Sequence, residues 1–152
     1  MKNERTIEVL NSLVIINNDR IEGYEIALKE TKEPDLKNLF AQFIATSKNC
    51  KQELAMEIET LGGKIAEGTN TSGKFFRAWM EVKAAITGKD RKAILKSCEY
   101  GEEKARSAYN DVLENELDDL NGEQQVRINA QKALLKGDHD HVKSLQNALV
   151  EA

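Results

Sequence analysis

One stretch of the chain, residues 97–109, places a carboxylate among small and aromatic residues at helical spacing. Cys98, Glu102, Ala105 and Tyr109 recur at intervals of three and four, so a helix would bring them to one face. A carboxylate on such a face is either a solvated group at the edge of the helix or a buried group that needs a partner. The second interpretation makes Glu102 a candidate for ion pairing or for metal binding.

Two histidines near the C-terminus supply the other residue type that metal chemistry in a helical bundle needs. Di-metal carboxylate sites combine carboxylates with histidine, and their usual signature is Glu-x-x-His, because positions i and i+3 of a helix project together. The chain has His139 and His141 but no Glu-x-x-His, and its nearest equivalent is Asp138-x-x-His141. His139 is therefore either a metal ligand or a hydrogen-bonded core residue, and we expect His141 to face solvent.

Four long amphipathic segments must position these groups. Apolar residues recur at intervals of three and four over residues 3–31, 34–61 and 89–117, and a fourth such segment follows a turn at 118–122. Pro34 suits the first position of a helix, and the Gly-Gly pair that follows the second segment is a helix terminator. No segment shows the alternation of a strand, so the sequence predicts an all-α protein.

The connections between the segments predict how the helices are arranged. Short turns join the first helix to the second and the third to the fourth, so each pair should form an antiparallel hairpin. Residues 62–73 are rich in glycine and small polar residues and predict a loop, which a short apolar helix with Phe75, Phe76 and Trp79 follows. We interpret loop and short helix as one long crossover outside the bundle; the alternative is an exposed contact with a second copy. The predicted architecture is an antiparallel four-helix bundle that forms a single domain over residues 1–152.

This arrangement places several polar residues at one height in the bundle. In an antiparallel pair of helices, two residues at the same height have numbers that add up to a constant, because both helices rise by about 1.5 Å per residue. The positions of the turns give a sum of about 65 for the first hairpin and about 239 for the second. Glu22 and Glu25 then come near Ser47, Glu102 and residues 138–141. These side chains include the ingredients of a carboxylate and histidine metal site.

The second helix leaves this level incomplete. The carboxylates that it offers as candidates, Glu53 and Glu57, lie one to three turns away, so the residues do not assemble a symmetrical site. The other candidates have simpler alternatives: an ion pair with a neighbouring helix for Glu102, and contact with water for Glu22 and Glu25.

Composition and charge narrow the partners and the compartment. The net charge is -4 with no concentrated block of lysine or arginine, which argues against nucleic acid. There is no apolar run of the roughly 20 residues that a membrane helix needs and no secretory signal, so we expect a cytoplasmic protein without a membrane contact. Cys50 and Cys98 fall within helical patterns, which favours two reduced, buried thiols; a disulfide between them is the alternative.

The chain carries distinctive motifs over nearly its whole length: Asp19-x-x-Glu22-Gly23-Tyr24, Pro34-Asp35-Leu36-Lys37-x-Leu39-Phe40, Glu53-Leu54 with Leu61-Gly62-Gly63, Trp79 with Lys83-Ala84-Ala85-Ile86-Thr87-Gly88, Cys98-Glu99-x-Gly101-Glu102 with Tyr109, and His139-Asp140-x-Val142. Together these motifs resemble a bacterial family of ferritin-like four-helix-bundle proteins known as a domain of unknown function. The resemblance implies the ferritin-like fold and, through wider kinship, a di-iron site built from Glu22, Glu53, Glu99 or Glu102, and His139.

Two hypotheses of function follow. The first is a dimeric ferritin-like bundle whose interior binds iron or another divalent metal; a redox-active site would serve oxygen or peroxide chemistry. The second is a non-catalytic stress-associated or scaffold protein in which the same polar residues form a satisfied hydrogen-bond network. The first hypothesis draws its metal ligands from Glu22, Glu25, Glu53, Glu99, Glu102 and His139.

Overall fold

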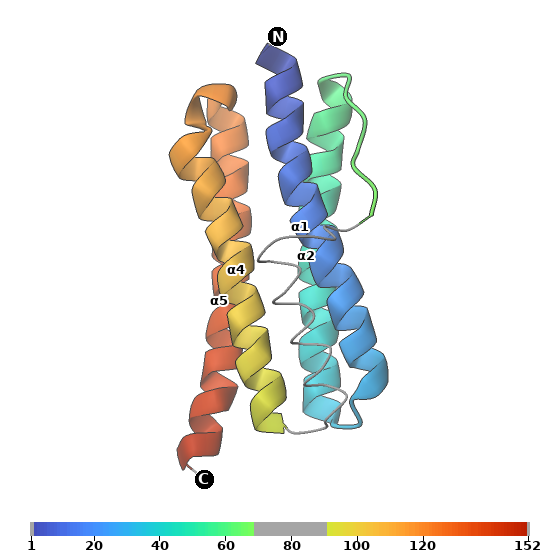
Figure 1. The fold of residues 1–152 in the computed structure, drawn as a ribbon, viewed down its shortest axis with the longest axis vertical. Coiled ribbons are helices and arrows are strands. Elements are labelled where there is room, and N and C mark those ends of the chain that lie inside the picture. Colours follow the sequence, from blue (N-terminus) through green and yellow to red (C-terminus); the bar gives the residue numbers. More distant parts are fainter. Residues whose placement is uncertain (1, 69–90, 152) are drawn as a thin grey trace.

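The computed structural model describes residues 2–68 and 91–151, and these residues form four long α-helices without any strand (Figure 1). A short 3-10 turn, η1, joins α4 to α5. The predicted all-α bundle is confirmed, whereas the predicted short helix with Phe75, Phe76 and Trp79 lies outside the described residues. The elements are α1 (Lys2–Glu30), α2 (Pro34–Thr60), α4 (Arg91–Asn115), η1 (Leu117–Asp119) and α5 (Gly122–Glu151).

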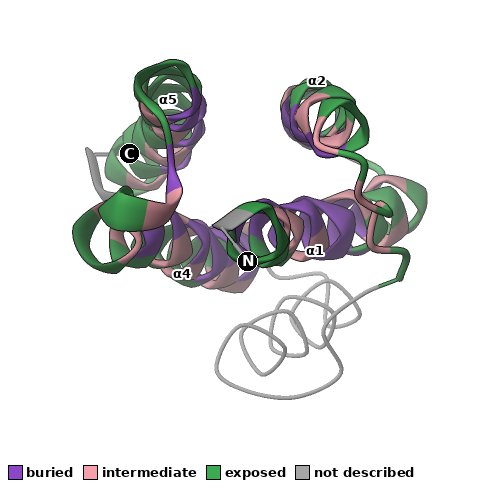
Figure 2. Cartoon of the chain, turned by 90° about the horizontal axis from the view of Figure 1, so that it is seen from above, coloured by how far each residue is buried: buried purple, intermediate pink, exposed green. Residues whose placement is uncertain are grey.

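The helices pack as two antiparallel hairpins, α1 with α2 and α4 with α5. The hairpins lie against each other through α1 with α4 and α2 with α5, so the four helices occupy the corners of a square (Figure 2). Figure 1 also shows that α2 and α4 run in the same direction, as a long connection between them requires. All four helices therefore face one common interior.

Both ends of α2 follow from local sequence. Pro34 occupies the first turn, where its missing N–H would have no helical partner. At the other end Gly62 has a φ of +79°, and the N–H groups of Gly62 and Gly63 donate to the carbonyls of Glu59 and Ile58 at 3.0 and 2.9 Å. This is a Schellman motif, in which glycine takes the left-handed conformation that other residues disfavour. The predicted glycine stop is confirmed.

The start of α5 is held by a capping box. The backbone N–H of Gln124 donates to Asn121 Oδ1 at 2.8 Å, and the backbone N–H of Asn121 donates to Gln124 Oε1 at 2.9 Å. Each side chain thus satisfies a backbone donor that the first turn of a helix leaves unpaired. Gln124 also donates from Nε2 to Glu57 of α2 at 2.9 Å, which links the two hairpins.

The described part of the predicted loop, residues 62–68, runs along α1. Asn11 donates to the carbonyl of Lys64 at 2.9 Å and accepts from the N–H of Ala66 at 2.8 Å, and Asn18 donates to the carbonyl of Gly68 at 2.8 Å. These bonds fix the backbone that follows α2 against the outer side of α1.

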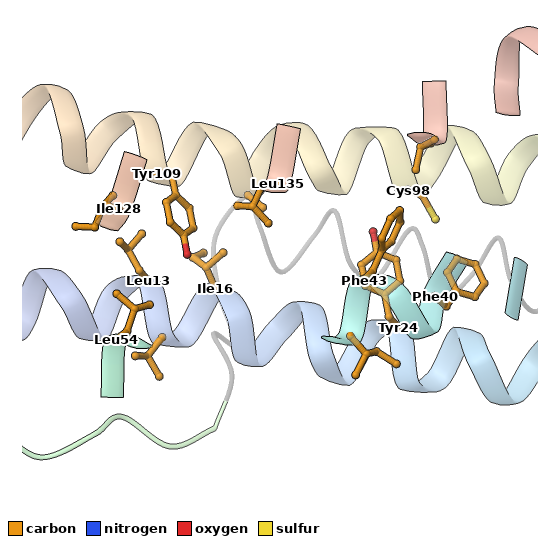
Figure 3. Close-up of a cluster of buried hydrophobic side chains, with 14 of the residues drawn as sticks. Leu13, Ile16, Tyr24, Phe40, Phe43, Leu54, Cys98, Tyr109, Ile128 and Leu135 are labelled. Carbon is orange, nitrogen blue, oxygen red and sulfur yellow. The ribbon is translucent and has the colours of Figure 1, made fainter. Parts of the chain in front are cut away.

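The core is one continuous cluster of apolar side chains from all four helices. Figure 3 shows Tyr24 and Phe43 near Cys98 at one level, and Tyr109 with Leu13, Ile128 and other residues at another. The Tyr24 ring lies 5.6 Å from that of Phe40 and 4.9 Å from that of Phe43, which are favourable aromatic separations. Cys50 and Cys98 are free and buried, which confirms the prediction of reduced thiols.

The spacing of apolar residues predicts inward positions for Ile21 and Leu149, and the structure differs at both. Leu149 is 36% exposed near the end of α5, and Ile21 is only partly buried. Arg20, which precedes Ile21, is completely buried in its place.

No helix in the described part of the chain is long and apolar enough to cross a membrane.

Candidate metal centre

The interior of the bundle holds an arginine that bonds to side chains from the other three helices. Arg20 of α1 donates from Nε to Glu102 of α4 at 2.9 Å and from Nη2 to Asp138 of α5 at 3.1 Å. Its Nη1 donates to the hydroxyl of Ser47 of α2, and its Nη2 donates also to the second oxygen of Glu102. Arg20, Ser47 and Glu102 are 0% exposed and Asp138 is 3% exposed, so water does not screen these interactions.

Burial and charge oppose each other in this network. Burial lowers the pKa of Arg20, but Glu102 and Asp138 outweigh it, so the pKa lies above its usual value and the guanidinium stays charged. Burial raises the pKa of Glu102 and of Asp138, and the facing guanidinium offsets only part of that rise. One permanent cation is therefore shared by two carboxyl groups, and the bidentate contact makes Glu102 its main partner.

Aromatic rings complete the surroundings of the guanidinium. Its central carbon lies 5.6 Å from the centroid of the Tyr24 ring and 5.8 Å from that of Phe43, within the range of cation–π attraction. The rings also exclude water from the pair, which strengthens the attraction between Arg20 and Glu102.

A second polar layer lies beside Tyr109. Asn17 of α1 donates to the Tyr109 hydroxyl at 2.9 Å, and this hydroxyl donates to Gln131 of α5 at 2.7 Å. Gln131 donates in turn to the carbonyl of Cys50 at 3.1 Å and to Glu53 Oε1 at 3.0 Å, both on α2. This layer, too, takes groups from all four helices.

The predicted common level is confirmed for three of its members, since Ser47, Glu102 and Asp138 meet in the structure. Arg20 was not predicted. Its signal in the sequence is position, because it stands three residues after Asn17 and four before Tyr24, on the inner stripe of α1.

These interior residues do not fit a di-iron centre. Both oxygens of Glu102 accept from Arg20, and those of Asp138 accept from Arg20 and from Gln42 at 3.4 Å. The guanidinium occupies the space between the carboxylates, and its fixed charge would repel a metal cation at that point. The interior polar level is an ion-pair network.

The six predicted metal ligands do not converge on one point. Glu22 and Glu25 are exposed on α1, and Glu53 is exposed on α2, where it accepts from Gln131. Glu102 is held by Arg20. The remaining two, Glu99 and His139, lie together on the side of the bundle formed by α4 and α5.

Glu99 and His139 form a cluster with Glu103, which the sequence did not single out. One ligand atom from each lies within 4.8 Å of the others, and among the described residues this is the only such group of three. His139 Nε2 is 3.6 Å from Glu103 Oε1, and Nδ1 is 3.6 Å from Asp140 Oδ1. Glu103 stands four residues after Glu99, a spacing that places both carboxylates on the face of α4 toward α5.

His139 is the unusual member of this cluster. Its side chain is 14% exposed, yet both ring nitrogens are buried and neither makes a hydrogen bond in the described structure. Buried polar atoms normally have a partner. Nδ1 lies beside Asp140, whereas Nε2 lies beside Glu103, so a cation held between Glu99, Glu103 and Nε2 would give this nitrogen a partner.

The fourth residue at this position is Lys143, one turn after His139 on α5. Its Nζ donates to Glu99 Oε1 at 3.2 Å. In the antiparallel hairpin, Glu103 faces His139 and Glu99 faces Lys143, so the four side chains form two adjacent rungs between α4 and α5.

Comparison with known proteins gives a match to one family model. A family model described as "Domain of unknown function (DUF2383)" matches residues 5–115, which span most of α1, all of α2 and α4, and the connections between them. The matched region includes Arg20, Glu99, Glu102 and Glu103, whereas Asp138 and His139 lie beyond it on α5. No curated protein matches the chain. Because the matched region covers well over half of its length, the chain belongs to the DUF2383 family.

Proposed function

We propose that this protein binds one divalent transition-metal ion at Glu99, Glu103 and His139, on the α4–α5 side of the bundle. The observation that carries the proposal is His139, whose buried Nε2 lies 3.6 Å from Glu103 Oε1 and makes no hydrogen bond with the described residues. The site differs from the interior di-metal centre that the family resemblance implies, because Arg20 occupies that interior.

The donor set indicates which metals fit. One imidazole and two carboxylates suit zinc, iron and manganese better than calcium or magnesium, which take oxygen ligands. Iron, the expected metal, therefore stays within the proposal. Three protein ligands would leave coordination positions for water or for a small ligand, as in zinc sites that are open to solvent.

Small side-chain rotations would close the site. Ligand atoms around one tetrahedral ion lie about 3.4 Å apart for bonds of about 2.1 Å, compared with up to 4.8 Å here. Glu103 is 54% exposed on its side chain and is free to rotate, whereas His139 is held between α4 and α5. The cluster thus has one fixed nitrogen and one mobile carboxylate.

The test is a titration of untagged protein with Co²⁺, Zn²⁺ and Fe²⁺, the last under anaerobic conditions, followed by calorimetry and, for Co²⁺, by its absorption bands. We expect one ion per chain, and binding at least ten times weaker in His139→Ala and in Glu103→Gln. Matched controls are His141→Ala and Glu22→Gln, which alter exposed residues of the same types. Equal affinity in all four variants, or no binding by the unmodified chain, would exclude the proposal.

A second candidate function is that of a non-catalytic structural bundle. The satisfied Arg20 network favours it, because it holds four helices together with polar groups that already bond to one another. Metal binding separates the two candidates, because a dimer is expected for the metal-binding bundle as well. A folded chain that binds none of the three metals would support this role and not the first.

The finer fold assignment is also a proposal. We infer a ferritin-like bundle from the parallel direction of α2 and α4, which lie diagonally opposite each other, whereas the helices that pack side by side are antiparallel. This direction follows from one long connection, which is the topology of ferritin-like folds.

A further inference from the structure

Lys143 places a cation next to the proposed metal position. Its ammonium group lies 3.2 Å from Glu99 Oε1, and Glu99 is one of the three proposed ligands. His139 and Lys143 are one turn apart on α5, as Glu99 and Glu103 are on α4, so both α5 side chains face the same pair of carboxylates.

The ammonium group and a metal ion would compete for the same carboxylate. A metal at about 2.1 Å from a Glu99 oxygen would lie within a few ångströms of Nζ, and two cations at that separation repel each other. Lysine cannot itself join the coordination shell while it is protonated, because it has donors and no acceptor. Binding of a metal therefore requires Lys143 to leave Glu99.

We propose that Lys143 is a resident counter-ion of the metal site, which a divalent cation displaces and which sets the affinity of the site. This inference rests on the proposed function. Glu99 is held with 19% of its side chain exposed, whereas Lys143 is 54% exposed on a flexible four-carbon stem. The lysine can swing into solvent without any movement of α5, so the exchange needs no change in the backbone.

The exchange explains how the cluster is stable without a metal. Glu99 and Glu103 carry like charges at adjacent turns of α4, an arrangement that destabilises a helix by itself. Lys143 neutralises part of this charge, and a divalent ion would neutralise more of it. The site thus alternates between a lysine form and a metal form, and it holds no bare pair of carboxylates in either.

The experiment compares dissociation constants for Co²⁺ and Zn²⁺ in the unmodified chain and three variants. Lys143→Met removes the competing charge and keeps a long, helix-favouring side chain. Lys143→Arg keeps the charge. Lys132→Met, on the same helix and with no ion pair to Glu99 or Glu103 among the described contacts, matches the change in net charge.

We expect Lys143→Met to bind both ions about two to five times more tightly, the range that a solvent-exposed ion pair can contribute. Lys143→Arg and Lys132→Met should bind like the unmodified chain. Tighter binding in Lys132→Met by the same factor would overturn the inference, since it would reflect net charge alone.

The outcomes separate the two proposals. Metal binding by the unmodified chain with unchanged affinity in Lys143→Met would overturn the role of Lys143 and leave the metal site standing. If Lys143→Met binds an ion and the unmodified chain does not, both proposals are supported, because Lys143 then prevents the ion from binding. If neither the unmodified chain nor Lys143→Met binds either ion, both proposals are wrong.

Discussion

Arg20 carries a permanent charge at a position that water does not reach. A buried charge is tolerated only with partners, and here Glu102 and Asp138 supply the counter-charge while Ser47 satisfies a further donor. The energetic significance of such a network lies less in the attraction that it adds than in the cost of leaving any part of it unpaired.

Replacing Arg20 tests this directly. We expect Arg20→Met to lower the free energy of unfolding by about 3–5 kcal/mol, because Glu102 and Asp138 would be left buried without a cation. Urea denaturation followed by circular dichroism measures the change. Arg91→Met is the matched control, since Arg91 pairs with Glu33 and Asp35 at the surface and should cost at most about 1 kcal/mol.

A triple variant keeps the test informative if Arg20→Met does not fold. In Arg20→Met with Glu102→Leu and Asp138→Leu, no charge is left unpaired, so most of the lost stability should return. A triple variant less stable than Arg20→Met, or equal losses in Arg20→Met and Arg91→Met, would contradict the account.

At the residue scale, the sequence predicted two of the residues that contact Arg20, but it did not predict Arg20 itself. Glu102 and Ser47 were placed at one level by helical spacing, and an ion pair was one of two alternatives for Glu102. Arg20 was missed because the inner stripe of α1 was followed through apolar residues, which selects Ile21. A charged side chain on that stripe is recognisable only once its counter-charges on other helices are known, and this is information about tertiary structure.

At the scale of helices, glycines have opposite roles at different positions. Gly62 ends α2 with a positive φ, whereas Gly137 lies within α5, where an added Cβ would meet no atom within 4 Å. The first glycine is required by the backbone conformation, and the second only weakens its helix.

We therefore expect opposite effects from the same substitution. Gly62→Ala should lower the free energy of unfolding by about 1–2 kcal/mol, the cost of a left-handed conformation for an L-residue. Gly137→Ala should raise it by about 0.5–1 kcal/mol through helix propensity. Urea denaturation of both variants measures the difference, and changes of the same sign would contradict the assignment of Gly62 as the helix terminator.

The bounds of the helices were the most predictable feature. Pro34 and the Gly62-Gly63 pair are local signals, and α2 begins and ends where they predict. The orientation of α5 was less predictable, because helical spacing alone allows either Asp138 or His139 to face the interior. Adjacent residues on a helix differ by about 100° in direction, and the structure turns Asp138 to the interior and His139 toward α4.

At the scale of the whole molecule, the two thiols report on the integrity of the bundle. Cys50 and Cys98 are both 0% exposed and come from diagonally opposite helices, α2 and α4. Burial raises the pKa of Cys50 to about 11, and burial raises that of Cys98 as well. Both thiols are therefore protonated and inaccessible in the folded protein.

We expect neither thiol to react with an aromatic disulfide reagent at pH 8 in the folded protein, and both to react in urea. The chain has no other cysteine, so the signal is unambiguous. Single Cys50→Ser and Cys98→Ser variants assign each reaction. A thiol that reacts at once in the folded chain would show that the described bundle is open at that level.

The direction and level of the helices were predictable because hairpins with short turns have a fixed numerical register. The residue that joins the helices at one level, Arg20, was not predictable, because many side chains can occupy the same height in a bundle. Glu103 illustrates this limit: it follows Glu102 directly, and only the position of α5 beside α4 makes its carboxylate a neighbour of His139.

The meeting of four helices at Arg20 has a consequence for the register of the bundle. Apolar stripes can be satisfied by helices shifted along one another by a turn of about 5.4 Å. Such a shift would move Ser47, Glu102 or Asp138 away from the guanidinium that each of them contacts. Arg20 thus disfavours slipped arrangements of the helices, whereas the apolar residues provide the drive to collapse.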